Sequence, residues 1–191
     1  MKNTLILLGL FLPFTLHANN FKPYIGADAS VSIMDFTTDT DMDENFTNIT
    51  INAGGKIGRN FGVELFYNHA IANDTTLSTL YDELTTELGF VAYGFDIFGY
   101  YNLSPDFEFF TSFGVANYDF EITQEYTDYI YGTTTQITTD ENRVSTRLGI
   151  GLMYTFSNQP VSLLAQYQYI PVNTNIINTI SEFSIGFRYS F

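Results

Sequence analysis

Residues 144–156 read VSTRLGIGLMYTF, and this stretch decides the fold class. Leu148 and Ile150 lie at even positions, whereas Arg147 and Gly149 lie at the odd positions beside them. Successive side chains of a β-strand point to opposite faces, so a period of two residues indicates a strand. The stretch therefore predicts a β-strand with one apolar face and one face of small or polar residues.

The same alternation recurs along the chain, and no helical period of 3.6 residues competes with it over a comparable length. Bulky apolar residues occupy one face of each segment, and mainly Gly, Ser, Asn or charged residues occupy the other. The further segments cover residues 25–33, 49–57, 63–67, 91–103, 109–115, 161–169 and 183–191. Together with the first stretch, they predict eight strands.

The polar face distinguishes the two architectures that such strands can build. A water-soluble sandwich would expose Lys, Glu and Asp on that face, whereas a membrane barrel turns its apolar face to lipid and keeps small polar residues inside. Glycines on the polar face leave space for bulky lumen residues, and tyrosines near strand ends are typical of interfacial girdles. These residues are Gly62, Gly94, Gly114, Gly149, Gly151 and Gly186, and Tyr67, Tyr101, Tyr154, Tyr169 and Tyr189. We therefore predict an all-β fold, a transmembrane antiparallel up-and-down barrel of eight strands, with a soluble sandwich as the alternative.

The connections between the predicted strands alternate in length. The short ones lie near residues 59–60, 102–106 and 157–160, and the long ones at about 35–45, 73–87, 119–142 and 171–180. Bacterial outer-membrane barrels have an even number of strands, short periplasmic turns and long extracellular loops. We therefore expect short periplasmic turns, with both ends of the barrel domain on that side, and long extracellular loops.

The composition of the 191-residue chain excludes several classes of protein. Aromatic residues make up 17% and charged residues only 15%, which is the opposite of a disordered chain. No apolar run after residue 16 approaches the roughly 20 residues of a transmembrane helix. The net charge of −14 has the wrong sign for phosphate binding, so we expect no nucleic-acid partner. The absence of cysteine excludes disulfide bonds, thiolate zinc sites and cysteine nucleophiles.

The N-terminal segment has the three parts of a secretory signal peptide. Lys2 supplies the basic region, residues 5–12 supply the apolar region, and residues 16–18 (LHA) form a cleavage site that ends in a small residue. We therefore expect a signal peptide at residues 1–18 and a single outer-membrane barrel domain at residues 19–191.

Three short motifs resemble small eight-stranded outer-membrane barrels of the opacity-protein, OmpX and OmpA kind. They are residues 21–27 (FKPYIGA), similar to an opening strand, residues 62–65 (GVEL), with a lumen-facing glutamate, and residues 185–191 (IGFRYSF). The last resembles the C-terminal signal for the barrel assembly machinery, which implies that role for Phe187, Tyr189 and Phe191. Members of this family include adhesins, serum-resistance factors, lipid A enzymes and purely structural proteins, so the resemblance does not choose a function.

Charged residues on the predicted lumen face form the first candidate site. Charged groups in a narrow interior must pair, so we expect a salt-bridge network that plugs the barrel, with a continuous pore as the alternative. Arg147 and Arg188 are the expected centres, because one guanidinium can bind two carboxylates. The predicted network consists of Asp28, Lys56, Glu64, Asp96, Glu108, Arg147, Glu182 and Arg188.

The predicted extracellular loops form the second candidate site. The first three long loops hold fifteen of the 21 acidic residues and no Lys or Arg. The third loop alternates tyrosines with acids beside a Thr-rich tract, a composition typical of recognition surfaces. The alternative is that its flanking strands simply continue beyond the bilayer as a hairpin. The recognition candidates are Asp39, Asp41, Asp43, Tyr126, Tyr129 and Tyr131.

The sequence predicts no catalytic, cofactor or metal site. The acidic run at 39–43 lacks the Gly and Glu of an EF-hand, because Glu44 and Thr50 stand at those positions. Weak Ca²⁺ or Mg²⁺ binding shared with lipopolysaccharide phosphates remains a hypothesis. His69, the one histidine after the signal peptide, lies on the apolar face, and no serine adjoins it to suggest a nucleophilic pair. We therefore expect no enzymatic activity.

We predict an outer-membrane surface protein of the adhesion, host-interaction or serum-resistance kind, whose acidic loops contact a host surface or matrix component. A structural barrel or narrow porin-like channel without a specific partner is the alternative, and a lipid A-modifying enzyme that uses His69 is the third hypothesis. The other expected partners are outer-membrane lipid, lipopolysaccharide and, during insertion, the barrel assembly machinery. We expect a monomer without a cofactor.

Overall fold

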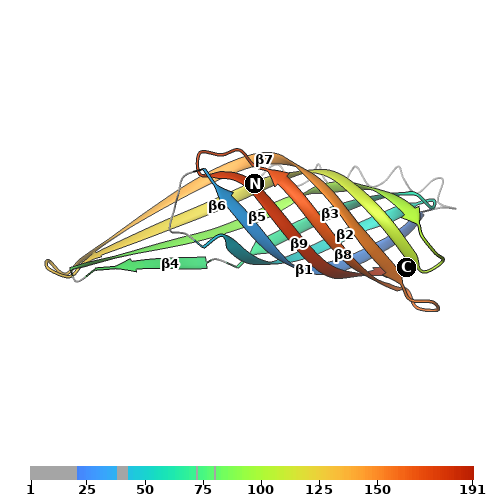
Figure 1. Cartoon of the computed structure of the whole chain (residues 1–191), viewed down its shortest axis with the longest axis horizontal. Helices are drawn as coiled ribbons and strands as arrows, with labels where there is room; N and C mark the ends of the chain where they lie inside the picture. The colour runs from blue at the N-terminus through green and yellow to red at the C-terminus, as the bar shows by residue number, and fades with distance from the viewer. Residues whose placement is uncertain (1–20, 38–42, 72, 80) are drawn as a thin grey trace, which may run out of the picture.

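The computed structural model describes residues 21–37, 43–71, 73–79 and 81–191 as β-strands and their connections (Figure 1). The predicted signal peptide at residues 1–18 lies outside the described residues. Within the described part of the chain, no helix is long and apolar enough to cross a membrane. The strands are β1 (Phe21–Phe36), β2 (Asn45–Ile57), β3 (Phe61–Ala70), β4 (Asn73–Ser78), β5 (Asp82–Asn102), β6 (Phe107–Asp128), β7 (Thr133–Thr155), β8 (Val161–Pro171) and β9 (Ile177–Ser190).

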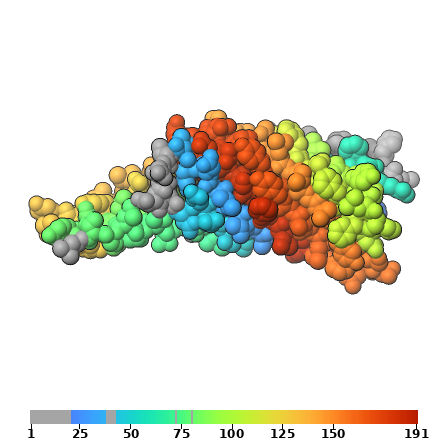
Figure 2. Space-filling view, in the orientation of Figure 1, coloured from blue at the N-terminus to red at the C-terminus, as the bar shows by residue number. Residues whose placement is uncertain are grey.

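Eight of these strands form a closed ring. β1 pairs with β2 and β9, β3 pairs with β2 and β5, and the remaining strands pair in chain order, always antiparallel. The strands wind obliquely around a common axis (Figure 1), and the first and last strands pack side by side on the viewed face (Figure 2). A closed ring leaves no edge unpaired, which strands need in order to cross a membrane. The predicted eight-stranded barrel is confirmed, and β4 is an additional strand outside the ring.

The barrel is apolar on the outside, and small polar and charged residues are buried inside it. In β1 the outward-facing Ile25 and Val31 are 51% and 47% exposed, whereas the inward-facing Asp28, Ser30 and Ser32 are at most 9% exposed. A similar alternation of exposed and buried residues runs through β2, β3, β8 and β9. Water would disfavour so large an apolar exterior, but lipid hydrocarbon matches it. This pattern supports the membrane barrel over the soluble sandwich.

The lumen is filled by three layers of side chains. A polar layer lies between two apolar clusters. The periplasmic cluster consists of Phe98, Tyr100, Phe110, Met153 and Leu164. The outer cluster, on the side of the long connections, includes Met34, Phe46, Phe66, Leu88, Phe90, Tyr118, Phe120, Ile122, Ile170, Val172, Ile177 and Ile180.

Two glycines show how the backbone makes room for the polar layer. Gly186 pairs with Asp28 across β9 and β1, and Gly114 pairs with Asp96 across β6 and β5. A Cβ atom added to either glycine would overlap the carboxylate of its partner. At these two positions glycine therefore leaves the space that the larger lumen residue occupies.

The outer parts of β5, β6 and β7 continue far beyond the barrel and form a narrow extension together with β4 (Figures 1 and 2). We call this extension the paddle and define it as residues 73–79, 81–90 and 119–142, with its tip at the turn residues 79, 81 and 129–132. Most residues of the long connections at 73–87 and 119–142 form paired strands rather than irregular loops. For 119–142 the alternative prediction, a hairpin that continues the flanking strands, is therefore confirmed. The unbroken register of β6 and β7 pairs the backbone groups that a loop would leave to water, and Thr-rich segments suit strands.

Candidate functional site

The structure places all eight charged residues predicted for the lumen inside the barrel. Seven of them are at most 9% exposed, and the eighth, Lys56, is half-buried. They form three ion-paired groups and one carboxylate held by neutral side chains. The groups are Asp28–Arg188–Glu64, Asp96–Arg147 and Lys56–Glu108, with Glu182 apart from them.

Arg188 is the best-connected residue of the lumen. Its Nη1 and Nη2 donate to the two carboxylate oxygens of Asp28 at 2.5 and 3.1 Å. Its Nε and Nη2 donate to the two oxygens of Glu64 at 2.8 and 3.2 Å. Because β9 neighbours β1 but not β3, this double fork ties adjacent strands and also crosses the lumen. Bidentate pairs of this kind are strong and geometrically specific.

Arg147 is held differently from Arg188. Its Nη2 lies 3.8 Å from Asp96 Oδ2 and donates to Gln168 Oε1, and Gln168 Nε2 donates to the same Asp96 oxygen at 3.4 Å. The guanidinium carbon stacks 3.7 Å from the centre of the Phe66 ring. Sequence reasoning missed Gln168 and Phe66, although both lie at lumen-facing positions of their strands.

Glu182 makes no ion pair with any described Lys or Arg side chain. Its Oε2 accepts hydrogen bonds from Ser32 Oγ at 3.1 Å, Asn48 Nδ2 at 3.3 Å and Asn68 Nδ2 at 3.4 Å. The lumen groups comprise five carboxylates and three cations, so neutral donors must satisfy the carboxylate that has no cation. Sequence reasoning missed these donors, because nothing separates them from other small polar lumen residues.

An ion pair near the periplasmic end of the lumen packs on an aromatic ring. Lys56 Nζ lies 2.5 Å from Glu108 Oε1 and 4.3 Å from the centre of the Tyr100 ring. A cavity of about 410 Å³ at this end reaches Glu64 and Arg188, and no residue of the outer cluster lines it. The ion-paired groups therefore separate the periplasmic cavity from the outer cluster and hold the strands together.

The paddle has an acidic face, which continues the outside of the barrel. One of its rows runs across the four strands through Asp74, Glu87, Thr123 and Thr138. Side chains paired across neighbouring strands lie on the same face, so acids and hydroxyls gather there. The acids of this face are Asp74, Glu83, Glu87, Asp119, Glu121, Glu125 and Asp140.

The opposite face of the paddle continues the lumen side and carries its exposed apolar side chains, among threonines and the acids Asp82, Asp128 and Glu141. Leu77, Leu84 and Tyr126 form one of its rows, and Ile137 lies nearby on β7. Leu77 is 48% exposed, Tyr126 43% and Ile137 59%. We call this the apolar face. Closer to the barrel it merges with Leu88 and Ile122 of the outer cluster.

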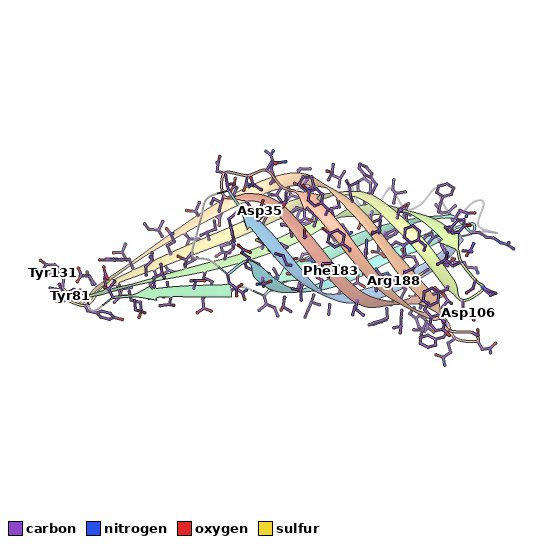
Figure 3. The ribbon with its side chains drawn as sticks, viewed as in Figure 1. Asp35, Tyr81, Asp106, Tyr131, Phe183 and Arg188 are labelled. Atoms are coloured by element: carbon purple, nitrogen blue, oxygen red, sulfur yellow. The ribbon has the colours of Figure 1, made fainter. Side chains whose placement is uncertain are left out.

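The tip of the paddle brings two hairpins together. The backbone N–H of Tyr129 donates to Tyr81 O at 2.9 Å, and the Tyr129 hydroxyl donates to Glu83 Oε2 at 3.0 Å. The second bond raises the pKa of Tyr129 above the ordinary tyrosine value. Partial desolvation and then nearby Asp82 raise the pKa of Tyr126. Tyr81, which sequence reasoning missed, lies at the tip with the predicted Tyr131 (Figure 3) and is hydrogen-bonded to the predicted Tyr129. The predicted Tyr126 lies farther along β6, where it pairs with Leu84.

The remaining predicted positions lie elsewhere. Asp39 and Asp41 fall outside the described residues, and the backbone N–H of Asp43 donates to Thr75 Oγ1 of β4 at 3.2 Å. Among the described residues, no three carboxylate or histidine side chains form a group that could hold a metal ion. His69 faces outward and pairs with Ile49 and Val91, neither of which could serve as a catalytic partner.

The three C-terminal aromatic residues face the outside of the barrel. Phe187, Tyr189 and Phe191 are all exposed, and the first two lie on β9 at the seam with β1. Their role as an assembly signal remains a prediction.

Several solved structures resemble this one. Neisserial surface protein A (NspA) matches with a TM-score of 0.61 at 14% identity, over 90% of this chain and 97% of that one. Ail, the attachment invasion locus protein of Yersinia pestis, matches in its complex with the heparin analogue sucrose octasulfate, with a TM-score of 0.55 at 13% identity, over 90% and 98% of the chains. A major outer membrane protein from Thermus thermophilus matches with a TM-score of 0.56 at 12% identity, over 88% and 99%. At these identities the likeness concerns the fold alone.

Sequence comparison agrees with the fold. No curated protein matches the chain by sequence. The family described as outer membrane protein beta-barrel domain matches residues 4–191. This match covers nearly the whole chain and agrees with the closed ring, the apolar exterior and the polar lumen. The chain therefore belongs to the outer-membrane protein β-barrel domain family and is a protein of the bacterial outer membrane.

Proposed function

We propose that this protein is a surface receptor of the adhesion or host-interaction kind, whose paddle binds a macromolecule outside the cell. The observation that carries the proposal is the tip of the paddle, where Tyr81, Tyr129 and Tyr131 are 59%, 54% and 79% exposed. Tyrosine supplies a large amphipathic contact area at a small entropic cost, so exposed tyrosines are typical of binding surfaces. The tip is also the part of the paddle that lies farthest from the barrel (Figure 3).

The packing of the lumen argues against a channel as the alternative function. Arg188 and Glu64 close the periplasmic cavity from the outer side, and the outer cluster fills the other end. A sealed lumen favours the second candidate function, a purely structural barrel, over a narrow channel. Current recordings of the protein in a planar bilayer distinguish a structural barrel from a narrow channel, and we expect no steady conductance.

Charge distinguishes this chain from its structural relative Ail. Ail has been seen with a heparin analogue, a polyanion. Residues 73–90 and 119–142 of the present chain contain ten acids and no Lys or Arg. Like charges across an interface are unfavourable, so we do not assign a sulfated sugar to this paddle.

Shortening the paddle tests the proposal. The pair Thr123 and Thr138 can be joined by Asn-Gly after removal of 124–137, because two paired strand positions suit a two-residue hairpin turn. In the same way, residues 75–86 are removed and Asp74 is joined to its paired residue Glu87 by Asn-Gly. Cells that carry the shortened protein should lose adherence to host cells or matrix, while the protein keeps its heat-dependent shift on a gel. Undiminished adherence would contradict the proposal. An unchanged heat-dependent gel shift would show that the barrel of the shortened protein is still folded.

A further inference from the structure

We propose that the apolar face of the paddle docks a cationic amphipathic segment of the partner protein. This inference rests on the proposed function and names the chemistry of its partner.

Exposed apolar side chains give the first argument. Leu77, Tyr126 and Ile137 lie on one face of a sheet that stands in water, and each exposes more than two fifths of its surface. Such a patch on a water-exposed element marks an interaction surface. On the opposite face of the same strands, the acidic face, the corresponding positions are acids and hydroxyls. The sheet is therefore two-sided, and only one side has apolar surface to bury.

Continuity with the core gives the second argument. The apolar face merges toward the barrel with Leu88, Phe90 and Ile122, which are packed in the outer cluster. A segment docked on Leu77 and Tyr126 would extend a core that is already formed. The backbone under it is held by the paired strands, so little ordering of the paddle would oppose binding.

Charge complementarity decides the occupant. Asp82 and Asp128 pair across β5 and β6 on the same face as the apolar row, and Asp82 Oδ2 accepts a hydrogen bond from the Tyr126 hydroxyl at 3.4 Å. No Lys or Arg in the paddle balances these acids. Lysine or arginine of a partner would meet carboxylates and tyrosine rings together, and both attract cations. Apolar residues of the same partner segment would cover the leucines.

Charge also argues against two other occupants. A second copy of the chain would bring another ten acids to the interface, and like charges repel. Residues 38–42 (TDTDM) of this chain add two more acids and only one apolar side chain, so their composition does not suit this face.

A peptide of alternating lysine and leucine is the probe for this face. The full protein is placed in nanodiscs of zwitterionic lipid, and empty nanodiscs measure binding of the peptide to lipid. We expect the peptide to bind the protein, and a peptide with serine in place of leucine to bind about tenfold or more weakly. A peptide with glutamate in place of lysine should not bind. Equal binding of the lysine–leucine and lysine–serine peptides would overturn the proposal, because charge alone would then explain it.

Two sets of substitutions assign the binding to one face. Leu77→Ser, Tyr126→Ser and Ile137→Ser together should weaken binding of the lysine–leucine peptide about tenfold or more. The matched control, Glu121→Gln with Glu125→Gln on the acidic face, should change binding by less than about threefold. An equal loss of binding in both sets would overturn the proposal. A protein dimer that dissociates when Leu77 is substituted would also overturn it, because a second copy of the chain would then occupy this face. The heat-dependent gel shift verifies that each variant is folded.

Cell adherence separates failure of this inference from failure of the proposed function. The protein with serine at Leu77, Tyr126 and Ile137 should adhere as poorly as the shortened paddle. If only the shortened paddle loses adherence, the paddle binds a partner through another surface and this inference is wrong. If the shortened paddle adheres normally, the proposed function itself is wrong.

Discussion

Replacing Arg188 with alanine isolates the energetic role of the lumen network. Arg188 donates four hydrogen bonds to the carboxylates of Asp28 and Glu64, and all three side chains are buried. Arg188→Ala leaves two buried carboxylates without their cation. Breaking a buried ion pair in this way lowers the free energy of unfolding by about 3–5 kcal/mol. We expect a loss in that range.

Two further variants separate the loss of charge from the loss of packing. Asp28→Asn, Glu64→Gln and Arg188→Met together remove all three charges while keeping similar side-chain volumes. Replacement of a whole buried network by neutral residues is often neutral, so we expect this variant to be more stable than Arg188→Ala by about 1–4 kcal/mol. Arg59→Ala in the exposed turn between β2 and β3 is the control, and we expect a change of about 0–1 kcal/mol.

The assay is unfolding by urea in lipid vesicles. The chain has no tryptophan, so far-ultraviolet circular dichroism and the folded fraction on a gel replace tryptophan fluorescence as probes. Linear extrapolation gives the free energy of unfolding in the absence of urea. If Arg188→Ala lowers the free energy of unfolding by less than about 1 kcal/mol, the reasoning is refuted, because a solvated surface ion pair contributes that much. An equal loss in the triple variant would also refute it, since volume rather than charge would then be the cause.

Three more predictions concern packing, the membrane boundary and the tip. Gly186→Val should lower the free energy of unfolding by about 1–3 kcal/mol, because its side chain would overlap the Asp28 carboxylate, and the urea assay measures this. Ile150→Lys, on the lipid-facing surface of the barrel, should lower the free energy of unfolding by about 2–4 kcal/mol in the same assay. Thr123→Lys, on the outward face of the paddle, should have little effect. Tyr129 should form tyrosinate only above the ordinary pKa of about 10, because its neutral hydroxyl donates to a carboxylate. The absorbance difference between the protein and Tyr129→Phe during titration measures this, and a midpoint at or below that of free tyrosine would contradict it.

The sequence predicted the barrel because lipid and lumen impose opposite chemistry on alternate residues. Ile25 and Asp28 illustrate this, since parity alone placed the first outside and the second inside. The same parity placed the eight charged residues in the lumen. Their pairing did not follow from it, because which strands face one another across the lumen depends on the stagger of the closed ring. The contact of Arg188 with Glu64 on β3 is of this kind.

The paddle was harder to predict for a different physical reason. Within the membrane the two faces of a strand meet different surroundings, so the hydrophobic alternation is strong. At Thr85 and Thr86, successive residues of β5 that face opposite sides of the sheet, both residues are polar although the backbone is still a strand. Above the membrane both faces of the sheet meet water, and the outward residues no longer need to be apolar. The hydrophobic alternation of the sequence therefore fades in the paddle although the strands stay paired, and its sequence resembles that of a loop.

One row of residues marks where this change occurs. Tyr67, Tyr93, Asn117 and Val144 pair side by side across β3, β5, β6 and β7 on the outward face. Asn117 Nδ2 donates to the Tyr93 hydroxyl and to Asp119 Oδ1, both at 3.1 Å, which begins the polar surface of the paddle. The row therefore has the aromatic and polar character of an interfacial girdle.

The length of strand below this row agrees with its being the outer boundary of the bilayer. From Tyr93 to Tyr101 of the opposite girdle β5 has nine residues, and a tilted strand needs about 9–11 to cross. Beyond the row the same face carries Asp119, which hydrocarbon would strongly disfavour, so the paddle must begin where the girdle ends. Ile150 lies between Val144 of the row and Tyr154 near the periplasmic end, so a lysine at Ile150 would meet lipid hydrocarbon. A lysine at Thr123 of the paddle would meet water.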